Sequence, residues 1–217
     1  MEKSILILSG GLDSTVSAWI AREQTKPLLA LTFDYSQRAV QREIESAAAT
    51  CQILGVRHEI VPLPWLAAIT PTALVNREAE LPALKESELD SVKTQATARA
   101  VWVPNRNGVF LNVGAAYAES LGADLLVTGF NAEEATTFPD NSAPFVRAAD
   151  EFFWYSTLTK VKVTSFTQGM TKREIAAKAR ELGVDLGKVW FCYEGEERPC
   201  RKCESCARFD RAVHHAN

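Results

Sequence analysis

The sequence predicts an α/β protein built on a doubly wound, mostly parallel sheet, with a small cysteine-rich region towards its C-terminal end. Three observations support this prediction. Apolar runs of strand length alternate with segments of helical periodicity, the pattern of parallel strands joined by right-handed crossovers. The first strand leads directly into a Ser-Gly-Gly turn that opens a helix. Four of the five cysteines fall between positions 192 and 206.

Composition limits the classes of protein to consider. A chain of 217 residues suits one domain, or one domain with a small appendage. With 47% hydrophobic and 24% charged residues it can bury a core, which argues against disorder. The net charge of -3 gives no general electrostatic reason to bind nucleic acid. Because no apolar run approaches the roughly 20 residues of a membrane span and no signal peptide is evident, we expect a cytoplasmic protein.

Strands and helices alternate in the first part of the chain. We expect strands at 4–9, 27–35 and 57–63 and helices at 13–24 and 37–54. Asp13 or Ser14 is the expected N-cap of the first helix. Gly55 is the expected end of the second helix.

Residues 64–107 interrupt this alternation with four prolines, many charges and little sustained periodicity, as functional or flexible insertions do. Regular order is expected to return with helices at 108–121, 146–159 and 172–183 and strands at 123–130 and 161–166. Thr171 and Glu174 form a capping box for the last of these helices. We therefore expect one α/β domain over 1–186 that carries the insertion, and a C-terminal region over 187–217 packed on it.

The turn Ser9-Gly10-Gly11-Leu12-Asp13-Ser14 has the features of an anion site. A strand–turn–helix unit places backbone N–H groups and the positive end of a helix dipole at the carboxyl edge of the strand. Two glycines let the backbone approach the anion, and the hydroxyls of Ser9, Ser14 and Thr15 can donate hydrogen bonds. The turn is not a Walker sequence, because it contains no lysine. A tight turn with an ordinary aspartate cap is the alternative interpretation.

The C-terminal cysteines have the spacing C-x7-C-x2-C-x2-C, formed by Cys192, Cys200, Cys203 and Cys206. This spacing suits a tetrahedral zinc site, and an iron–sulfur cluster is the alternative. In a cytosolic chain such clustering favours a metal over a disulfide framework. Cys51, on the apolar face of a predicted helix, is most simply a core residue.

The hexapeptide at 9–14 resembles the SGGxDS loop of the ATP pyrophosphatases, which cleave ATP between the α and β phosphates. The tail "WFCYEGEERPCRKCESCARFDRA" resembles the end of the 7-cyano-7-deazaguanine synthases. Further matches to that family are "FDYSQR" (33–38), "WVPNRNGVFL" (102–111), "TGFNAEEATTFPDNSAPF" (128–145) and "MTKREI" (170–175). The resemblance therefore covers nearly the whole chain.

This resemblance implies a Rossmann-like fold of the adenine nucleotide alpha hydrolase type and a homodimer with one structural Zn²⁺ per chain. It also implies Mg²⁺ and the use of ATP to convert 7-carboxy-7-deazaguanine and ammonia into 7-cyano-7-deazaguanine, in queuosine biosynthesis. Acyl-adenylate and amide would be the intermediates, and AMP and pyrophosphate would be released. Neither a nucleic acid nor a membrane is an expected partner.

Residue roles follow from the matched motifs and from the loop positions. ATP is expected to contact Leu8, Ser9, Gly10, Gly11, Leu12, Asp13, Ser14, Thr15, Asp34, Arg38, Gly129 and Lys172. The acid is expected to contact Asn131, Phe138, Asp140 and Arg106, just beyond the carboxyl end of a strand. Asp13, Lys172 and Arg106 are the candidate catalytic residues. Asp13 should hold Mg²⁺ or orient the loop, Lys172 should reach a phosphate, and the arginines should clamp carboxylate or phosphate.

One departure from the family leaves the exact acid and the nitrogen nucleophile open. Asn141 and Ser142 stand where many members have Cys-Arg, in a loop expected to face the acid. The alternatives are a ligase that couples a deazaguanine acid to another amine, a tRNA-modifying enzyme with the same loop, and a nucleotide-binding module without turnover. A tRNA thiolase would need a free reactive thiol, and Cys51 is expected to be buried.

Valine at Gly10 or Gly11 is expected to abolish ATP binding and leave the fold intact, because a side chain would fill the space where phosphates approach the backbone. Calorimetric titration with ATP measures the binding, and circular dichroism reports on the fold. Undiminished nucleotide binding in these variants would contradict an anion site in this turn.

Overall fold

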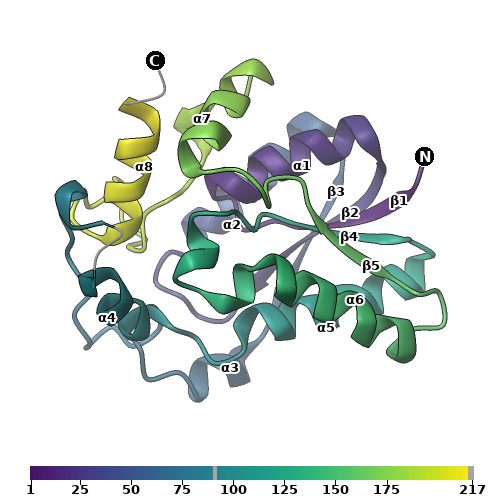
Figure 1. Ribbon diagram of the computed structural model, residues 1–217, viewed down its shortest axis with the longest axis horizontal. Helices are drawn as coiled ribbons and strands as arrows, with labels where there is room; N and C mark the ends of the chain where they lie inside the picture. The colour runs from purple at the N-terminus through teal and green to yellow at the C-terminus, as the bar shows by residue number, and fades with distance from the viewer. Residues whose placement is uncertain (90–91, 215–217) are drawn as a thin grey trace.

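The computed structural model describes residues 1–89 and 92–214, and in this part of the chain the strands form one five-stranded parallel sheet (Figure 1). The strands are β1 (Lys3–Ile7), β2 (Lys26–Asp34), β3 (Arg57–Pro62), β4 (Leu125–Thr128) and β5 (Lys162–Ser165). Their order across the sheet is β3-β2-β1-β4-β5, and every neighbouring pair is parallel. The predicted doubly wound parallel sheet is confirmed.

Helices cover both faces of the sheet (Figure 1). One face carries α1 (Leu12–Gln24) and α2 (Val40–Leu54), with α7 (Lys172–Glu181) packed on α1. The other face carries α5 (Arg106–Leu121) and α6 (Ala143–Ser156). Three further α-helices are α3 (Pro64–Ala68), α4 (Val92–Val101) and α8 (Glu204–His214). Among the described residues, no helix is long and apolar enough to cross a membrane.

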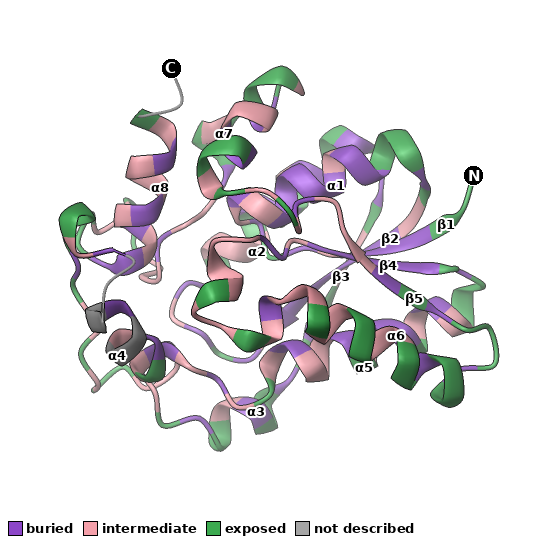
Figure 2. Cartoon of the chain, viewed as in Figure 1, coloured by how far each residue is buried: buried purple, intermediate pink, exposed green. Residues whose placement is uncertain are grey.

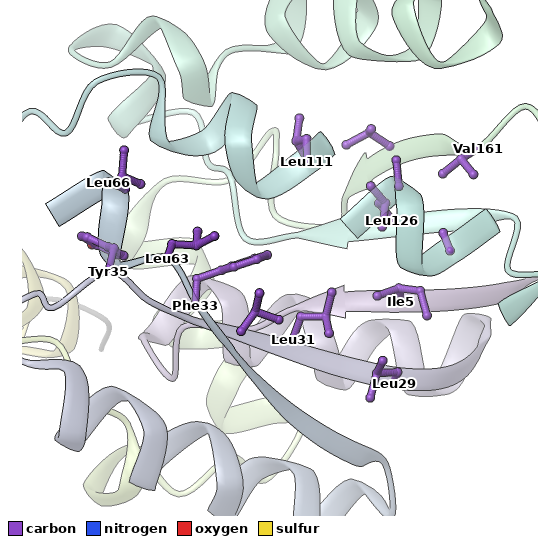
Figure 3. Packing of buried hydrophobic residues seen from close by; sticks show 14 of the residues in the cluster. Ile5, Leu29, Leu31, Phe33, Tyr35, Leu63, Leu66, Leu111, Leu126 and Val161 are labelled. Carbon is purple, nitrogen blue, oxygen red and sulfur yellow. The ribbon is translucent and has the colours of Figure 1, made fainter. Parts of the chain in front are cut away.

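Alternate residues of β2 pack on opposite faces of the sheet, as in a strand buried on both sides. Leu31 and Phe33 point to the side of α5, where Leu111 and Leu126 join them (Figure 3). Ala30 packs on the other side with buried residues of α1 and α2, among them Cys51. The central strands are accordingly buried along most of their length (Figure 2), and Cys51 has the core position that the sequence predicted.

The C-terminal region packs on the α/β part through a third apolar cluster. Ala212 of α8 lies in this cluster with Ile175 of α7 and Val16 of α1. A short antiparallel bridge between Ala83 and Cys203 joins the region to the insertion as well. Division of the chain at residue 187 into two parts stays a proposal.

The expectation that 64–107 is irregular was partly wrong. Helix α4 has no strong apolar stripe, but it buries Ala98 and Val101. The backbone of Ala73 also donates a hydrogen bond of 2.9 Å to the carbonyl of Ala100, which ties the segment before α4 to its end. Tertiary contacts therefore stabilise helical structure that local periodicity did not indicate.

Helix ends differ from the predicted ones where the backbone departs from local preference. Helix α1 begins at Leu12, so neither Asp13 nor Ser14 is its N-cap; Gly11 has that position, without a side-chain cap. Helix α6 begins earlier than predicted because the Ser142 hydroxyl accepts a hydrogen bond of 3.3 Å from the Phe145 N–H. The capping box of α7 and the left-handed Gly55 after α2 were predicted correctly.

Strand order reverses between β1 and β4, because β2 lies on one side of β1 and β4 lies on the other. The connections that leave these two strands therefore run in opposite directions and leave a crevice beyond the carboxyl ends of the strands. Open α/β sheets bind ligands at such a switch point. The Ser-Gly-Gly turn follows β1, and the loop that begins at Gly129 follows β4. The fold therefore brings the Ser-Gly-Gly turn and the loop after β4 together at the carboxyl edge of the sheet.

Candidate active site

A cavity of about 250 Å³ opens at this switch point. Its walls come from the turn after β1, the ends of β2 and β4, the starts of α2, α5 and α7, and the segment around the cysteines. Ten residues that the sequence predicted as site residues line it: Leu8, Ser9, Gly11, Leu12, Asp13, Ser14, Arg106, Gly129, Phe138 and Lys172.

The turn after β1 leaves the start of α1 open to an anion. The Ser14 hydroxyl contacts the Ser9 hydroxyl at 3.0 Å and donates to the Gly11 carbonyl at 3.2 Å. Among residues 1–89 and 92–214 no side chain caps the first N–H groups of α1, which therefore remain available to a ligand. The end of β4 lies close against the first turn of α1. Gly129 makes this contact possible, because a Cβ there would lie 2.4 Å from the Ser14 nitrogen.

Gly10 lies behind the turn rather than in the cavity lining. Its φ is +75°, and a Cβ would lie 2.6 Å from the Glu43 carbonyl oxygen. Its own carbonyl accepts hydrogen bonds from the Trp190 N–H at 2.9 Å and the Ser46 hydroxyl at 2.7 Å. The prediction that valine at Gly10 leaves the fold intact is therefore wrong. At Gly11 the nearest contact of a Cβ would be at 3.5 Å, so Gly11→Val is the variant that tests ATP binding.

Two predicted ligand contacts, one at the end of β2 and one just after it, are not brought to the cavity. The Asp34 carboxylate accepts a hydrogen bond of 2.9 Å from the Ser36 N–H. The Arg38 guanidinium pairs with Glu194 at 3.0 Å and donates to the Asn76 carbonyl at 2.9 Å, with 8% of its side chain exposed. In the structure Arg38 therefore joins the C-terminal region to the insertion.

Three other predicted residues lie close behind the lining. Asn131 is fully buried, and its Oδ1 accepts a hydrogen bond of 2.8 Å from the Glu134 N–H, while its Nδ2 has no partner among the described residues. Asp140 lies near Arg106, where burial raises the pKa of its carboxyl and the Arg106 charge lowers it, with a net increase. Thr15 is buried, and in the part of the chain that the structure describes its hydroxyl also has no hydrogen-bond partner.

Lys172 lies between two carboxylates at the mouth of the anion site. Its ammonium pairs with Asp13 and, at 2.7 Å, with Glu134, although these residues are far apart in the sequence. Burial raises the pKa of Asp13 to about 6 despite the opposing charge of Lys172. Burial alone would lower the pKa of Lys172, but the two carboxylates outweigh it and raise that pKa, so the ammonium stays charged. The Oδ1 atom of Asp13 is buried and has no hydrogen-bond partner within residues 1–89 and 92–214.

A second ionic cluster fixes the loop after β4 to helix α8. The Glu133 carboxylate accepts hydrogen bonds from the Lys172 backbone N–H at 3.3 Å and from Arg208 at 2.7 Å, and it also pairs with Arg211. Arg208, with 5% of its side chain exposed, pairs with the buried Glu204 at 2.9 Å as well. The helix of the cysteine-rich region thereby positions the loop that carries Glu134 and the start of α7.

Aromatic rings form the wall on the side of β2 and α5. Phe33 and Phe110 stack with ring centroids 4.1 Å apart. Arg106 donates a hydrogen bond of 3.2 Å to the Tyr35 hydroxyl and lies over the Tyr35 ring. Burial is the main cause of the raised pKa of Tyr35. A flat, polar ring system is the kind of ligand that suits these stacked faces.

Several lining residues were not predicted as site residues from the sequence. They are Tyr35, Glu43, Phe110, Glu134, Trp190, Phe191 and Tyr193. All of them except Glu43 lie in the matched motifs and could have been chosen from them. Glu43 has no chemical signature in the sequence, because only the folded chain places it beside the turn.

The four predicted metal-ligating cysteines come together, with their Sγ atoms all within 4.8 Å of one another. Cys192, Cys203 and Cys206 are buried. The Cys192 sulfur accepts hydrogen bonds of 3.3 Å from the N–H groups of Glu194 and Cys200, which favour its thiolate form. This cluster can hold a metal ion.

Fold and site define an α/β protein with a glycine-rich turn and an uncapped helix start at the switch point of its parallel sheet. The U34-tRNA thiolase NcsA from Methanococcus maripaludis is similar in fold, with a TM-score of 0.51, 17% identity, and coverage of 85% of this chain and 58% of that one. A 4-thiouridine synthetase solved with RNA and ATP has a TM-score of 0.50 and 19% identity, covering 98% of this chain and 50% of that one. At these identities the likeness shows the fold alone.

The family is shown by sequence. The family model of the queuosine biosynthesis protein QueC matches residues 3–217, and the chain belongs to this family. A 7-cyano-7-deazaguanine synthase from Pelotomaculum thermopropionicum is 51% identical over 97% of this chain and 96% of its own length. One from Methanosarcina mazei is 49% identical over 97% of this chain and 93% of its own length.

Replacing Arg208 by methionine is expected to lower the free energy of unfolding by about 3 to 5 kcal/mol, because it removes the ion-pair partner of the buried Glu204 and one of the two arginines that pair with Glu133. Urea unfolding followed by circular dichroism measures the loss. Lys178→Met is the matched control, since the pair of Lys178 with Glu181 lies at the surface, and it should cost less than about 1 kcal/mol. Equal stabilities of the two variants would show that the Arg208 cluster has no such role.

Proposed function

We propose that this chain converts 7-carboxy-7-deazaguanine, ammonia and ATP into 7-cyano-7-deazaguanine, with release of AMP and pyrophosphate. The observation that carries the proposal is the similarity, over almost the full length of both chains, to relatives named for the synthesis of this nitrile. The cavity supports it, because an anion-binding turn and stacked aromatic walls share one crevice.

ATP is proposed to bind with its phosphates at the start of α1. The uncapped N–H groups of the first turn and the helix dipole would receive the negative charge. Lys172 would exchange part of its pairing with Asp13 and Glu134 for a phosphate oxygen. Its charge is retained in the absence of phosphate because those two carboxylates hold it.

Mg²⁺ fits the same cluster. Asp13 offers a buried oxygen without a partner, and Glu134 is a second carboxylate beside it, which are the ligand types that Mg²⁺ takes. When bound, the ion would neutralise charge on the phosphates. Asp13 would then be a metal ligand, the role that reconciles a carboxylate with an anion-binding turn.

The reaction needs two activations. The carboxylate oxygen of the acid attacks the α-phosphorus of ATP, pyrophosphate leaves, and ammonia then displaces AMP to give the amide. The amide oxygen attacks a second ATP, and loss of AMP and of the remaining N–H protons gives the nitrile. Both carboxyl oxygens thus leave on AMP. With one anion-binding turn in the described part of the chain, the same site would serve both steps.

The chain contributes mainly position and charge to these steps. Arg106, held against Tyr35, would face the developing negative charge between the acid and the α-phosphate. Phe138 lines the cavity and stacks on Trp102 with centroids 6.2 Å apart, so it would contact the ring from one side. Asn131 and Asp140 would act from behind the lining, where they fix the Glu134 backbone and balance the Arg106 charge.

The departure at positions 141 and 142 has unequal consequences. Asn141 lines the cavity, whereas the Ser142 hydroxyl caps α6. Only the asparagine is therefore placed to affect the choice of acid. Coupling to an amine other than ammonia stays an alternative that the product would reveal.

Zn²⁺ is proposed as the ion of the four cysteines, because four clustered thiolates with two C-x2-C steps suit its tetrahedral geometry. Its role would be structural, since no cysteine is needed for the chemistry above. A homodimer also stays a prediction from the family.

Supplied with 7-carboxy-7-deazaguanine, ammonium and Mg-ATP, the protein is expected to form the nitrile with two AMP per molecule of product. Mass spectrometry follows the acid, amide and nitrile, and chromatography quantifies the nucleotides. ¹⁸O in the carboxylate should appear in AMP. Accumulation of the amide alone, ADP instead of AMP, or turnover only with another amine would overturn the proposal.

A further inference from the structure

Glu43 is a cavity carboxylate outside the cluster that surrounds Lys172. It lies in the first turn of α2 and lines the cavity. Asp13 and Glu134, the other two carboxylates of the lining, are both paired with Lys172. In the described part of the chain Glu43 has no ion pair, and its Oε2 accepts a hydrogen bond of 2.7 Å from Gln37. Its other oxygen is left for a ligand.

Gln37 fixes the position of this carboxylate. It is 2% exposed, and its Oε1 accepts a hydrogen bond of 3.0 Å from the Tyr35 N–H. Its Nε2 donates to the Phe33 carbonyl at 3.1 Å and to Glu43. Because one end of the amide must accept from an N–H and the other must donate to a carbonyl, its orientation is determined. The glutamate is therefore held before any ligand arrives.

The surroundings of Glu43 suit a flat ligand with a polarised edge. Phe33 and Tyr35 lie at the end of β2 (Figure 3), and both belong to the cavity wall with Phe110. Arg106 contacts the hydroxyl end of Tyr35, whereas Gln37 contacts the backbone N–H of that residue, so the positive charge lies at the far end of Tyr35 from Gln37. Burial raises the pKa of Glu43, while Gln37 and Arg106 act to lower it. N–H donors from a ligand would stabilise the ionised carboxylate further.

A guanine-type ring has the matching edge. Its ring N–H and its exocyclic amino group point the same way, as two parallel donors. A carboxylate offers two oxygens with two acceptor sites each, so the bond from Gln37 to Oε2 leaves room for a second donor there. Arg106 would meanwhile face the carboxyl group at the other end of the ligand.

We propose that Glu43 binds the N–H and 2-amino edge of the 7-deazaguanine ring and thereby selects the 2-amino acid as substrate. This inference rests on the proposed function, since it assigns a subsite for that substrate. Glu43 is a specificity residue in this account and takes no part in proton transfer.

The test compares 7-carboxy-7-deazaguanine with the analogue that lacks the 2-amino group, by calorimetric binding to the full-length protein without turnover. Wild type should bind the amino compound about 10- to 100-fold more tightly, the range for a hydrogen bond to a charged group. Glu43→Gln should bring this preference to within about threefold, because the amide presents N–H groups to the ligand's donors. The ATP affinity of Glu43→Gln should stay within about twofold of wild type, since Glu43 lies outside the group of Asp13, Glu134 and Lys172 that is proposed to meet the phosphates.

Two further variants complete the design. Glu45→Gln on the exposed side of the same helix is the matched control and should keep the full preference. Glu43→Asp keeps the carboxylate on a side chain that is one methylene shorter. It should therefore retain more of the preference for the 2-amino compound than Glu43→Gln. Thermal unfolding and ATP binding show whether each variant is folded.

The possible failures are distinguishable. If Glu43→Gln keeps the wild-type preference, or loses affinity equally for both compounds, the subsite assignment is wrong while the proposed function stands. A fall in kcat with the preference unchanged would indicate proton transfer by Glu43 and would overturn the assignment too. If wild type binds neither acid, the proposed function fails and the subsite fails with it.

Discussion

The carbonyl of Gly10 joins three segments of the chain that are distant in sequence. It accepts hydrogen bonds from the Trp190 N–H and the Ser46 hydroxyl, and that hydroxyl also contacts the Lys188 carbonyl at 2.7 Å. Gly10 has a left-handed φ, and there is no room for a Cβ at this position. The turn, α2 and the C-terminal region can therefore pack closely here because residue 10 is a glycine. The anion-binding turn is therefore shaped partly by residues near the other end of the chain.

Electrostatics connect the same regions a second time. Glu133 and Glu134 are neighbours in one loop, yet Glu133 is held by Arg208 of α8 and Glu134 pairs with Lys172. Burying these charges has a desolvation cost that a packed apolar core would not have. The structure offsets that cost with several partners for each charge, and the result is a lysine held beside the uncapped start of α1.

Short sequence patterns were sufficient to predict the structural features that depend on residues close together in the chain. The parallel sheet, the Ser-Gly-Gly turn that opens a helix, the capping box at Thr171 and the cysteine spacing are all short-range patterns, and the structure contains each of them. The position of Glu43 in the cavity depends on contacts between β2, α2 and the turn. No short stretch of sequence could therefore indicate that Glu43 lines the cavity. Arg38 shows the converse, because a residue type suited to phosphate binds Glu194 and the insertion instead.

We propose that the cysteine-rich region completes the ATP site, because Trp190 holds the Gly10 carbonyl of the turn. The most direct test is calorimetric titration of the full-length protein with Mg-ATP, before and after removal of the metal by a chelator. The account predicts one zinc per chain by elemental analysis and an ATP affinity that falls about tenfold or more on metal removal, while circular dichroism still shows the folded sheet. Equal ATP affinities of the metal-loaded and metal-free protein would contradict it.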